Sequence, residues 1–199
     1  MFKKLTNPFT YIAGKKSLLI GLLVIFATSI VAFYSNTYFP DIISVKMGVD
    51  LSLISGVTQN FLNWIVVSLL FYLAAISLSK SKIRIVDIFG TQALARIPYF
   101  FVSLISFSEV IDLYGKYLLW VYMKHGEPIE ITMVQKSIAV FFLFVSLLLT
   151  IWLVTLMFNA YKVAANLKGA RLIASFIVIM IISMVVLTYL SPIILSMIK

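Results

Sequence analysis

The sequence predicts an all-α fold: a polytopic membrane bundle of five transmembrane helices, with a short amphipathic interfacial helix between the third and the fourth. Only 12% of the 199 residues are charged and 62% are hydrophobic, whereas soluble domains carry about 25% charged residues. The charges leave five long apolar stretches, and about twenty apolar residues in a helix cross the roughly 30 Å of a bilayer's hydrocarbon core. We therefore expect one membrane domain over residues 17–198, after a cytoplasmic lead-in over residues 1–16.

The charges between the apolar stretches alternate in character along the chain. One set of connections, starting with the N-terminal segment, holds ten basic residues and one acidic residue: Lys3, Lys4, Lys15, Lys16, Lys80, Lys82, Arg84, Lys162, Lys168 and Arg171 with Asp87. The other set holds five basic and six acidic residues: Lys46, Lys116, Lys124, Lys136 and Lys199 with Asp41, Asp50, Glu109, Asp112, Glu127 and Glu130. Positive residues accumulate in short cytoplasmic loops. This predicts a cytoplasmic N-terminus and an outer C-terminus.

The net charge of +9 does not indicate nucleic-acid binding. The basic residues do not cluster around aromatic side chains or an element that would read the major groove. We expect no nucleic-acid partner, and membrane lipids as the surroundings of the chain.

The first span is predicted over residues 17–38, and Phe39-Pro40-Asp41 ends it. A charged start followed by an apolar run also resembles a signal peptide. No A-x-A cleavage pattern follows Phe33, however, and four more spans come after it, so we interpret this segment as an uncleaved first span.

The second uncharged stretch, residues 51–79, is longer than one perpendicular crossing requires. Its first part is polar enough for the outer interface or for shielding a cavity, so the span is predicted over residues 61–79. Trp64 is expected near the outer end, where aromatic rings favour the membrane interface. Gln59, Asn60 and Asn63 are candidates for lining a shallow outer cavity.

The third span is predicted over residues 91–108 and contains Arg96 and Pro98. Pro98 removes a helix hydrogen bond and is expected to kink the helix. Two interpretations of Arg96 remain open. Its side chain either extends to lipid headgroups at the cytoplasmic end, or serves as an interior anchor that pairs with Asp87, Gln92 or an anionic lipid.

The amphipathic segment follows over residues 110–123. Glu109, Asp112 and Lys116 fall on one helical face opposite apolar residues, which favours a helix lying on the outer surface over a crossing. The last two spans are predicted over residues 138–158 and 172–191, and the first of them can extend into the cytoplasm.

The sequence shows no visible catalytic machinery. It has no cysteine and a single histidine, His125, which stands beside Glu127 and Glu130 in a predicted outer loop. A metal site would need more nitrogen or sulfur ligands, and no catalytic motif stands in a span. We expect no enzymatic activity, no metal and no cofactor.

Two segments resemble one known family. Asn7-Pro8-Phe9 precedes the first span, and Val86-Asp87-Ile88-Phe89-Gly90-Thr91-Gln92-Ala93-Leu94-Ala95-Arg96-Ile97-Pro98 enters the third. Together they resemble the Yip (Ypt/Rab-interacting) family in its short prokaryotic form. The resemblance implies five spans, a cytoplasmic N-terminus and a location in the bacterial cytoplasmic (inner) membrane. It also implies a non-enzymatic role, since eukaryotic relatives work in vesicle traffic and membrane organisation. The candidate structural or interaction residues in the motif are Asp87, Gly90, Gln92, Arg96 and Pro98.

Three functions are therefore compared. The first is a scaffold, assembly or accessory factor for a membrane complex such as an exporter or trafficking machinery, with an integral membrane protein or a second copy of the chain as partner. The alternative is a transporter-like unit for a small solute, an ion or a lipid, motivated by Arg96, Pro98 and the polar group at residues 59–63. The third, a lipid-modifying enzyme, would need a convergent polar cluster.

Overall fold

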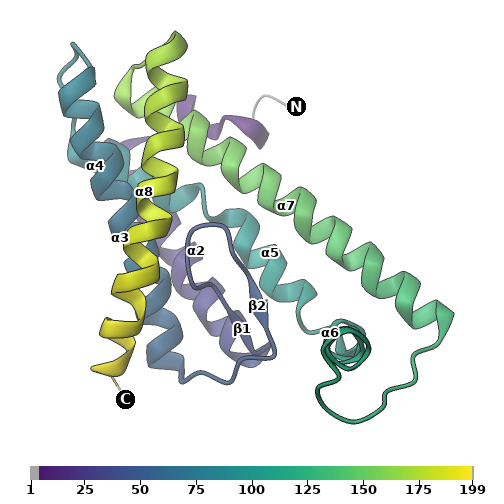
Figure 1. Cartoon of the computed structure of the whole chain (residues 1–199). Coiled ribbons are helices and arrows are strands. Elements are labelled where there is room, and N and C mark those ends of the chain that lie inside the picture. The colour runs from purple at the N-terminus through teal and green to yellow at the C-terminus, as the bar shows by residue number, and fades with distance from the viewer. Residues whose placement is uncertain (1–4, 199) are drawn as a thin grey trace.

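The computed structural model describes residues 5–198 and is a bundle of long helices (Figure 1). The elements are η1 (Pro8–Thr10), α2 (Gly14–Tyr34), β1 (Thr37–Tyr38), β2 (Lys46–Met47), α3 (Leu53–Leu78), α4 (Ile85–Leu94), α5 (Ile97–Ile105), α6 (Glu109–Met123), α7 (Met133–Ala165) and α8 (Gly169–Ser196). Five helical segments are long and apolar enough to cross a membrane: α2, α3, α4 with α5, α7 and α8. The predicted all-α membrane bundle is confirmed.

The spans differ from the predicted ones mainly at their ends. The second span begins at Leu53 rather than at residue 61, because Ser52 caps the helix by accepting a hydrogen bond from the Ser55 amide at 3.2 Å. The polar residues at 59–63 therefore lie within α3. The helix of the fourth span, α7, continues beyond residue 158 to Ala165. The lack of turn residues after residue 158 had suggested this extension.

The two ends of the bundle carry different features. One end, here called the basic end, holds the start of α2, the α3–α4 connection and the α7–α8 connection, with their lysines and arginines (Figure 1). The opposite end, here called the hairpin end, holds the β1–β2 hairpin, α6 and the end of α8. This distribution agrees with the alternation of charge along the sequence.

The third span is the centre of the bundle and is broken. α4 packs against α2, α3 and α7, and α5 packs against α2 and α7. The helix stops at Leu94 and resumes at Ile97, with Pro98 in the first turn of α5. Proline has no amide hydrogen to donate and suits the first turn of a helix, so the predicted interruption at Pro98 is confirmed.

Two glycines allow α2 and α4 to approach closely. A Cβ atom on Gly21 would lie 2.5 Å from the Ala93 Cβ and 2.5 Å from the Leu94 backbone nitrogen. A Cβ atom on Gly90 would lie 2.6 Å from the Ser17 Oγ. Small residues at such crossings let helix backbones meet in a membrane, where packing rather than the hydrophobic effect holds helices together.

A cluster of aromatic rings joins α3, α7 and α8 near the basic end. Phe71 of α3 packs at 4.5 Å between ring centroids from Tyr161 of α7 and at 5.6 Å from Phe176 of α8. Phe158 meets Phe176 edge to face at 5.2 Å. The buried part of α7 lies in this region, which fixes the end of that helix against the rest of the bundle.

The β1–β2 hairpin was not predicted. The first span ends at Tyr34, and Thr37 and Tyr38 pair antiparallel with Met47 and Lys46. Burial raises the pKa of the Tyr38 hydroxyl above its usual value, and the charge of Asp41 adds to this effect. The turn is held by Asp41, whose Oδ1 accepts hydrogen bonds from the amides of Ile43 and Ser44, each at 2.8 Å.

α6 lies roughly perpendicular to the spans. In Figure 1 it is seen end-on, whereas α3, α7 and α8 are seen from the side. Ile111 is its buried residue, and Lys116 pairs with Asp112 at 2.6 Å on an exposed face. The predicted amphipathic helix between the third and fourth spans is confirmed, with its first residue at Glu109.

Thr132→Ala is expected to destabilise the start of α7 by about 1 kcal/mol. The Thr132 Oγ1 accepts a hydrogen bond from the Gln135 amide at 3.3 Å, and the Gln135 Oε1 accepts one from the Thr132 amide at 3.0 Å, a capping box. Thermal unfolding in detergent measures the loss. Thr132→Ser, which keeps the accepting oxygen, is the control and should restore most of the stability; equal losses in both variants would contradict the capping role.

Candidate functional site

Polar side chains gather inside the bundle in its half toward the hairpin end. Gln59, Asn60 and Asn63 of α3 are at most 5% exposed, although they lie in a helix long and apolar enough to cross a membrane. Buried polar groups are expensive in such surroundings unless they are hydrogen-bonded. Their partners therefore show what the cluster does.

Gln59 and Asn63 hold the loop of the hairpin. The Asn63 Nδ2 donates to the carbonyls of Phe39 and Asp41 at 2.8 and 2.9 Å. The Gln59 Nε2 has the Pro40 carbonyl at 2.9 Å and the Asn63 Oδ1 and Ser191 Oγ both at 2.8 Å. An amide nitrogen has two hydrogens, so these three acceptors share them. The network ties the hairpin loop to α3 and α8.

The loop is also fastened to the third span. Phe39 stacks on Tyr99 of α5 with ring centroids 4.5 Å apart, and the Tyr99 hydroxyl donates to the Ile42 carbonyl. Phe39 and Ile42 are both 1% exposed. The loop between the strands is thus part of the core.

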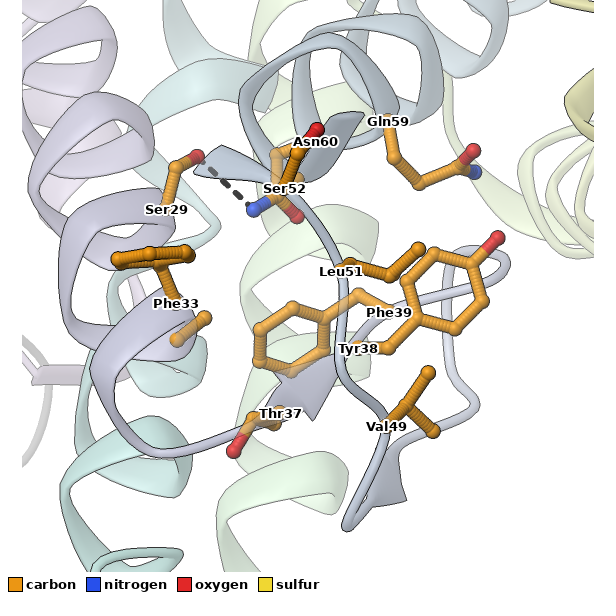
Figure 2. Close-up of a pocket in the computed structure, with 12 residues that line it drawn as sticks. Ser29, Phe33, Thr37, Tyr38, Phe39, Val49, Leu51, Ser52, Gln59 and Asn60 are labelled. Carbon is orange, nitrogen blue, oxygen red and sulfur yellow. Dashed lines mark hydrogen bonds between the residues drawn. The ribbon is translucent and has the colours of Figure 1, made fainter. Parts of the chain in front are cut away.

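Asn60 points to the other side of α3, toward α2. Its Nδ2 donates to the Ser29 Oγ at 2.9 Å, the contact drawn in Figure 2. Both residues line a pocket of about 10 Å³ with Gln59, Thr37 and Phe39. A cavity lined by Gln59 and Asn60 was predicted and is present, but Asn63 does not line it because its amide faces the hairpin loop.

Arg96 lies inside the bundle, at the break between α4 and α5, and is 4% exposed. The interpretation that it extends to headgroups is therefore wrong. Neither proposed protein partner contacts it: Asp87 pairs with Arg84 at 2.8 Å, and the Gln92 Nε2 donates to the Met157 carbonyl at 3.1 Å. Because Pro98 interrupts the helix here, Arg96 turns toward α2 and α3, where Thr28 and Asn60 share a small cavity with it.

The other candidate residues do not converge on one site. Asp87 lies at the basic end, and its hydrogen bond raises the pKa of the exposed Arg84 above its usual value. Gly90 faces α2, Gln92 faces α7, and Pro98 is buried at the start of α5. These motif residues therefore contact different neighbours of the third span and do not form one site.

Sequence reasoning missed two polar residues of the first span, Thr28 and Ser29. Both are at most 3% exposed and face Asn60 and Arg96. A signal was available, since they are the only adjacent hydroxyl residues in the apolar stretch of α2. Trp64 was placed wrongly at the interface: it is 8% exposed, and its Nε1 donates to the Phe89 carbonyl of α4 at 3.0 Å.

The most exposed apolar surface belongs to residues 134–151, here called the open half of α7. The structure describes every residue of this range, and Ala139 is the one that is buried. Only 11% of the most apolar stretch of α7 is buried, against 67% for α4 with α5. The large side chains on this surface are Val134, Ile138, Val140, Phe141, Leu143, Phe144, Leu147, Leu148 and Ile151.

α7 packs against α5 and α6, and α6 meets it within the open half. The Lys136 Nζ lies 5.5 Å from the centre of the Tyr117 ring of α6, and Figure 1 shows α7 leaving α3 and α8 as it approaches the hairpin end. The candidate functional features are therefore this open helix surface and the enclosed polar cluster around Arg96. Comparison of the chain with models of protein families, with curated proteins and with solved structures found no match.

Proposed function

We propose that the protein is a non-enzymatic membrane scaffold or assembly factor of the Yip type, and that a transmembrane helix of an integral membrane partner packs on the open half of α7. The observation that carries the proposal is the unequal burial of α7. Its second half is fixed in the core by Leu153, Leu156 and Tyr161, while Ala139 is the one buried residue within residues 134–151. A helix held firmly at one end and free at the other offers a preformed docking surface.

The composition of this surface suits a helix partner. It carries Phe141, Phe144, Leu148 and Ile151, spaced by three or four residues along one face. Such spacing forms the ridges into which side chains of a neighbouring helix fit. Lipid chains cover any apolar surface, so the partner gains mainly through van der Waals packing that disordered chains do not provide.

The polar interior supports this function over the transporter-like alternative. Gln59 and Asn63 are occupied by the hairpin loop, and the two cavities that Asn60 lines hold about 10 Å³ each. A solute path would need a wider opening between helices. In the proposed arrangement the basic end is cytoplasmic, in keeping with the positive-inside rule, and the membrane is the bacterial inner membrane.

Photocrosslinking in native membranes tests the proposal. A benzoylphenylalanine at Phe144, which is 57% exposed, is compared with one at Phe26 of α2, which is 49% exposed and also lies in a helix apolar enough to cross a membrane. We expect the Phe144 position to form an adduct with one other membrane protein, and the Phe26 position to form only lipid adducts.

Three outcomes would count against the proposal. Lipid adducts alone at both positions would leave the open half of α7 as a lipid-facing surface. Equal protein adducts at both positions would show that the contact is unspecific. An adduct with a second copy of this chain would replace the proposed partner by a homo-oligomer.

A further inference from the structure

A small cavity lies inside the bundle at the break between α4 and α5. Its lining residues are Ile25 and Thr28 of α2, Asn60 of α3, and Arg96 and Tyr99 of the third span. Each of them is at most 5% exposed. Three helices therefore enclose the cavity, and two of its lining side chains, Thr28 and Arg96, are polar groups without a protein partner.

The cavity is rich in unused hydrogen-bond donors. The Arg96 Nε, the Arg96 Nη2 and the Thr28 Oγ1 are buried atoms that find no partner in the described chain. Asn60 donates one amide hydrogen to Ser29, and its amide carries a second. Buried donors without acceptors are costly, so the site favours a ligand that accepts several hydrogen bonds.

The positive charge of Arg96 is not balanced by the protein. The guanidinium group does not lose its proton in proteins. The ion pairs within residues 5–198 are Arg84 with Asp87 and Lys116 with Asp112, and neither includes Arg96. A buried charge without a counter-charge is strongly unfavourable, which selects an anion over a neutral ligand.

The size of the cavity limits the anion. Its volume is about 10 Å³, about the room for one water molecule. A lipid phosphate, a sulfate or a carboxylate is too large, whereas a halide ion is only slightly larger than water. We propose that this cavity binds one chloride ion, which accepts hydrogen bonds from Arg96, Thr28 and Asn60 and neutralises the guanidinium group.

The proposed entry of the ion is from the hairpin end. Asn60 lines both this cavity and the pocket of Figure 2, and Ser29, which also lines that pocket, is the residue after Thr28. Asn60 and Ser29 are joined by a hydrogen bond, and we expect this bond to open when the ion enters.

Chloride binding is measured on the purified full chain by thermal unfolding in detergent. Sodium chloride is titrated against sodium gluconate at constant ionic strength, because gluconate is too large for the cavity. We expect the unfolding temperature to rise with chloride in the manner of one binding site, bromide to act in the same way, and chloride-35 NMR lines to broaden in the presence of the protein.

Three variants locate the effect. Thr28→Val removes a donor without changing the shape and should raise the chloride concentration at half effect about tenfold. Arg96→Met should abolish the response while the bundle still folds, since an apolar residue replaces an unpaired charge. Ser183→Ala removes another buried hydroxyl without a partner, in α8, and should leave the response unchanged.

The proposal fails if the unfolding temperature of the unmodified protein is the same in chloride and in gluconate, in which case water fills the cavity. It also fails if Thr28→Val keeps the original chloride response, a result that can be read even if Arg96→Met does not fold. This site is independent of the proposed partner helix, and either proposal can fail alone.

Discussion

Gly21→Ala is expected to destabilise the protein by about 3 kcal/mol, and Gly21→Leu to prevent stable assembly. A Cβ at position 21 would lie 2.5 Å from the Leu94 nitrogen and 2.6 Å from the Ala93 carbonyl carbon. These are backbone atoms of α4, which cannot rotate away as a side chain can. The helices would have to separate at the crossing that places the central span.

Unfolding in mixed SDS micelles measures the change in the free energy of unfolding. Gly56→Ala is the matched control, because Gly56 also lies in a spanning helix and no atom lies within 4 Å of its added Cβ. The control should be neutral or slightly stabilising, since alanine favours the helix more than glycine. Similar losses at both positions would show that the α2–α4 crossing is not tightly packed.

Asn63→Leu is expected to cost about 3 kcal/mol and to release the hairpin loop. The side chain is fully buried and makes three hydrogen bonds: two from its Nδ2 to the Phe39 and Asp41 carbonyls, and one from Gln59 to its Oδ1. Leucine fits a similar volume but takes the Asn63 donor away from the Phe39 and Asp41 carbonyls, whereas the Gln59 amide keeps Pro40 and Ser191 as acceptors. The loss of stability therefore comes from buried carbonyl groups that lack a hydrogen-bond donor, not from a cavity.

Gln92→Met provides the comparison for Asn63→Leu. Gln92 is equally buried but makes one hydrogen bond, from its Nε2 to the Met157 carbonyl, so its loss should be about 1 kcal/mol. Limited proteolysis of the loop over residues 39–45 adds a local readout, which should change for Asn63→Leu only. Equal stability losses, with the loop protected in both, would contradict the anchoring role of Asn63.

The sequence predicted the number of spans and the amphipathic helix because both depend on local features. Twenty uncharged residues suffice to recognise a span, and the stripe of Glu109, Asp112 and Lys116 suffices to recognise α6 as interfacial. The orientation, the bacterial inner membrane and the family resemblance stay predictions.

The hairpin and the placement of Asn63 could not be predicted because they depend on contacts between distant residues. Gln59 and Asn63 were expected to line a shallow outer cavity, because polarity alone does not identify a partner. Their actual partners are carbonyls some twenty residues earlier and a serine in the last span. Trp64 was misplaced for the same reason, since its partner is a carbonyl of α4.

Arg96 was recognised as unusual, but its environment was not. Its sequence neighbours suggested Asp87 or Gln92 as partners, whereas the break before Pro98 turns the side chain toward α2 and α3. The residues it faces, Thr28 and Asn60, come from two other helices. A helix interruption changes the direction of side chains in a way that spacing along one continuous helix does not describe.

The divergence of α7 widens the bundle toward the hairpin end. α7 has 33 residues and is about 50 Å long, more than the hydrocarbon thickness of about 30 Å, and it moves away from α3 and α8 toward the hairpin end (Figure 1). In a bilayer crossed by these spans we expect the chain to displace more lipid from the leaflet at the hairpin end than from the other. Such a wedge would favour a bilayer that curves with the hairpin-end leaflet on its convex side.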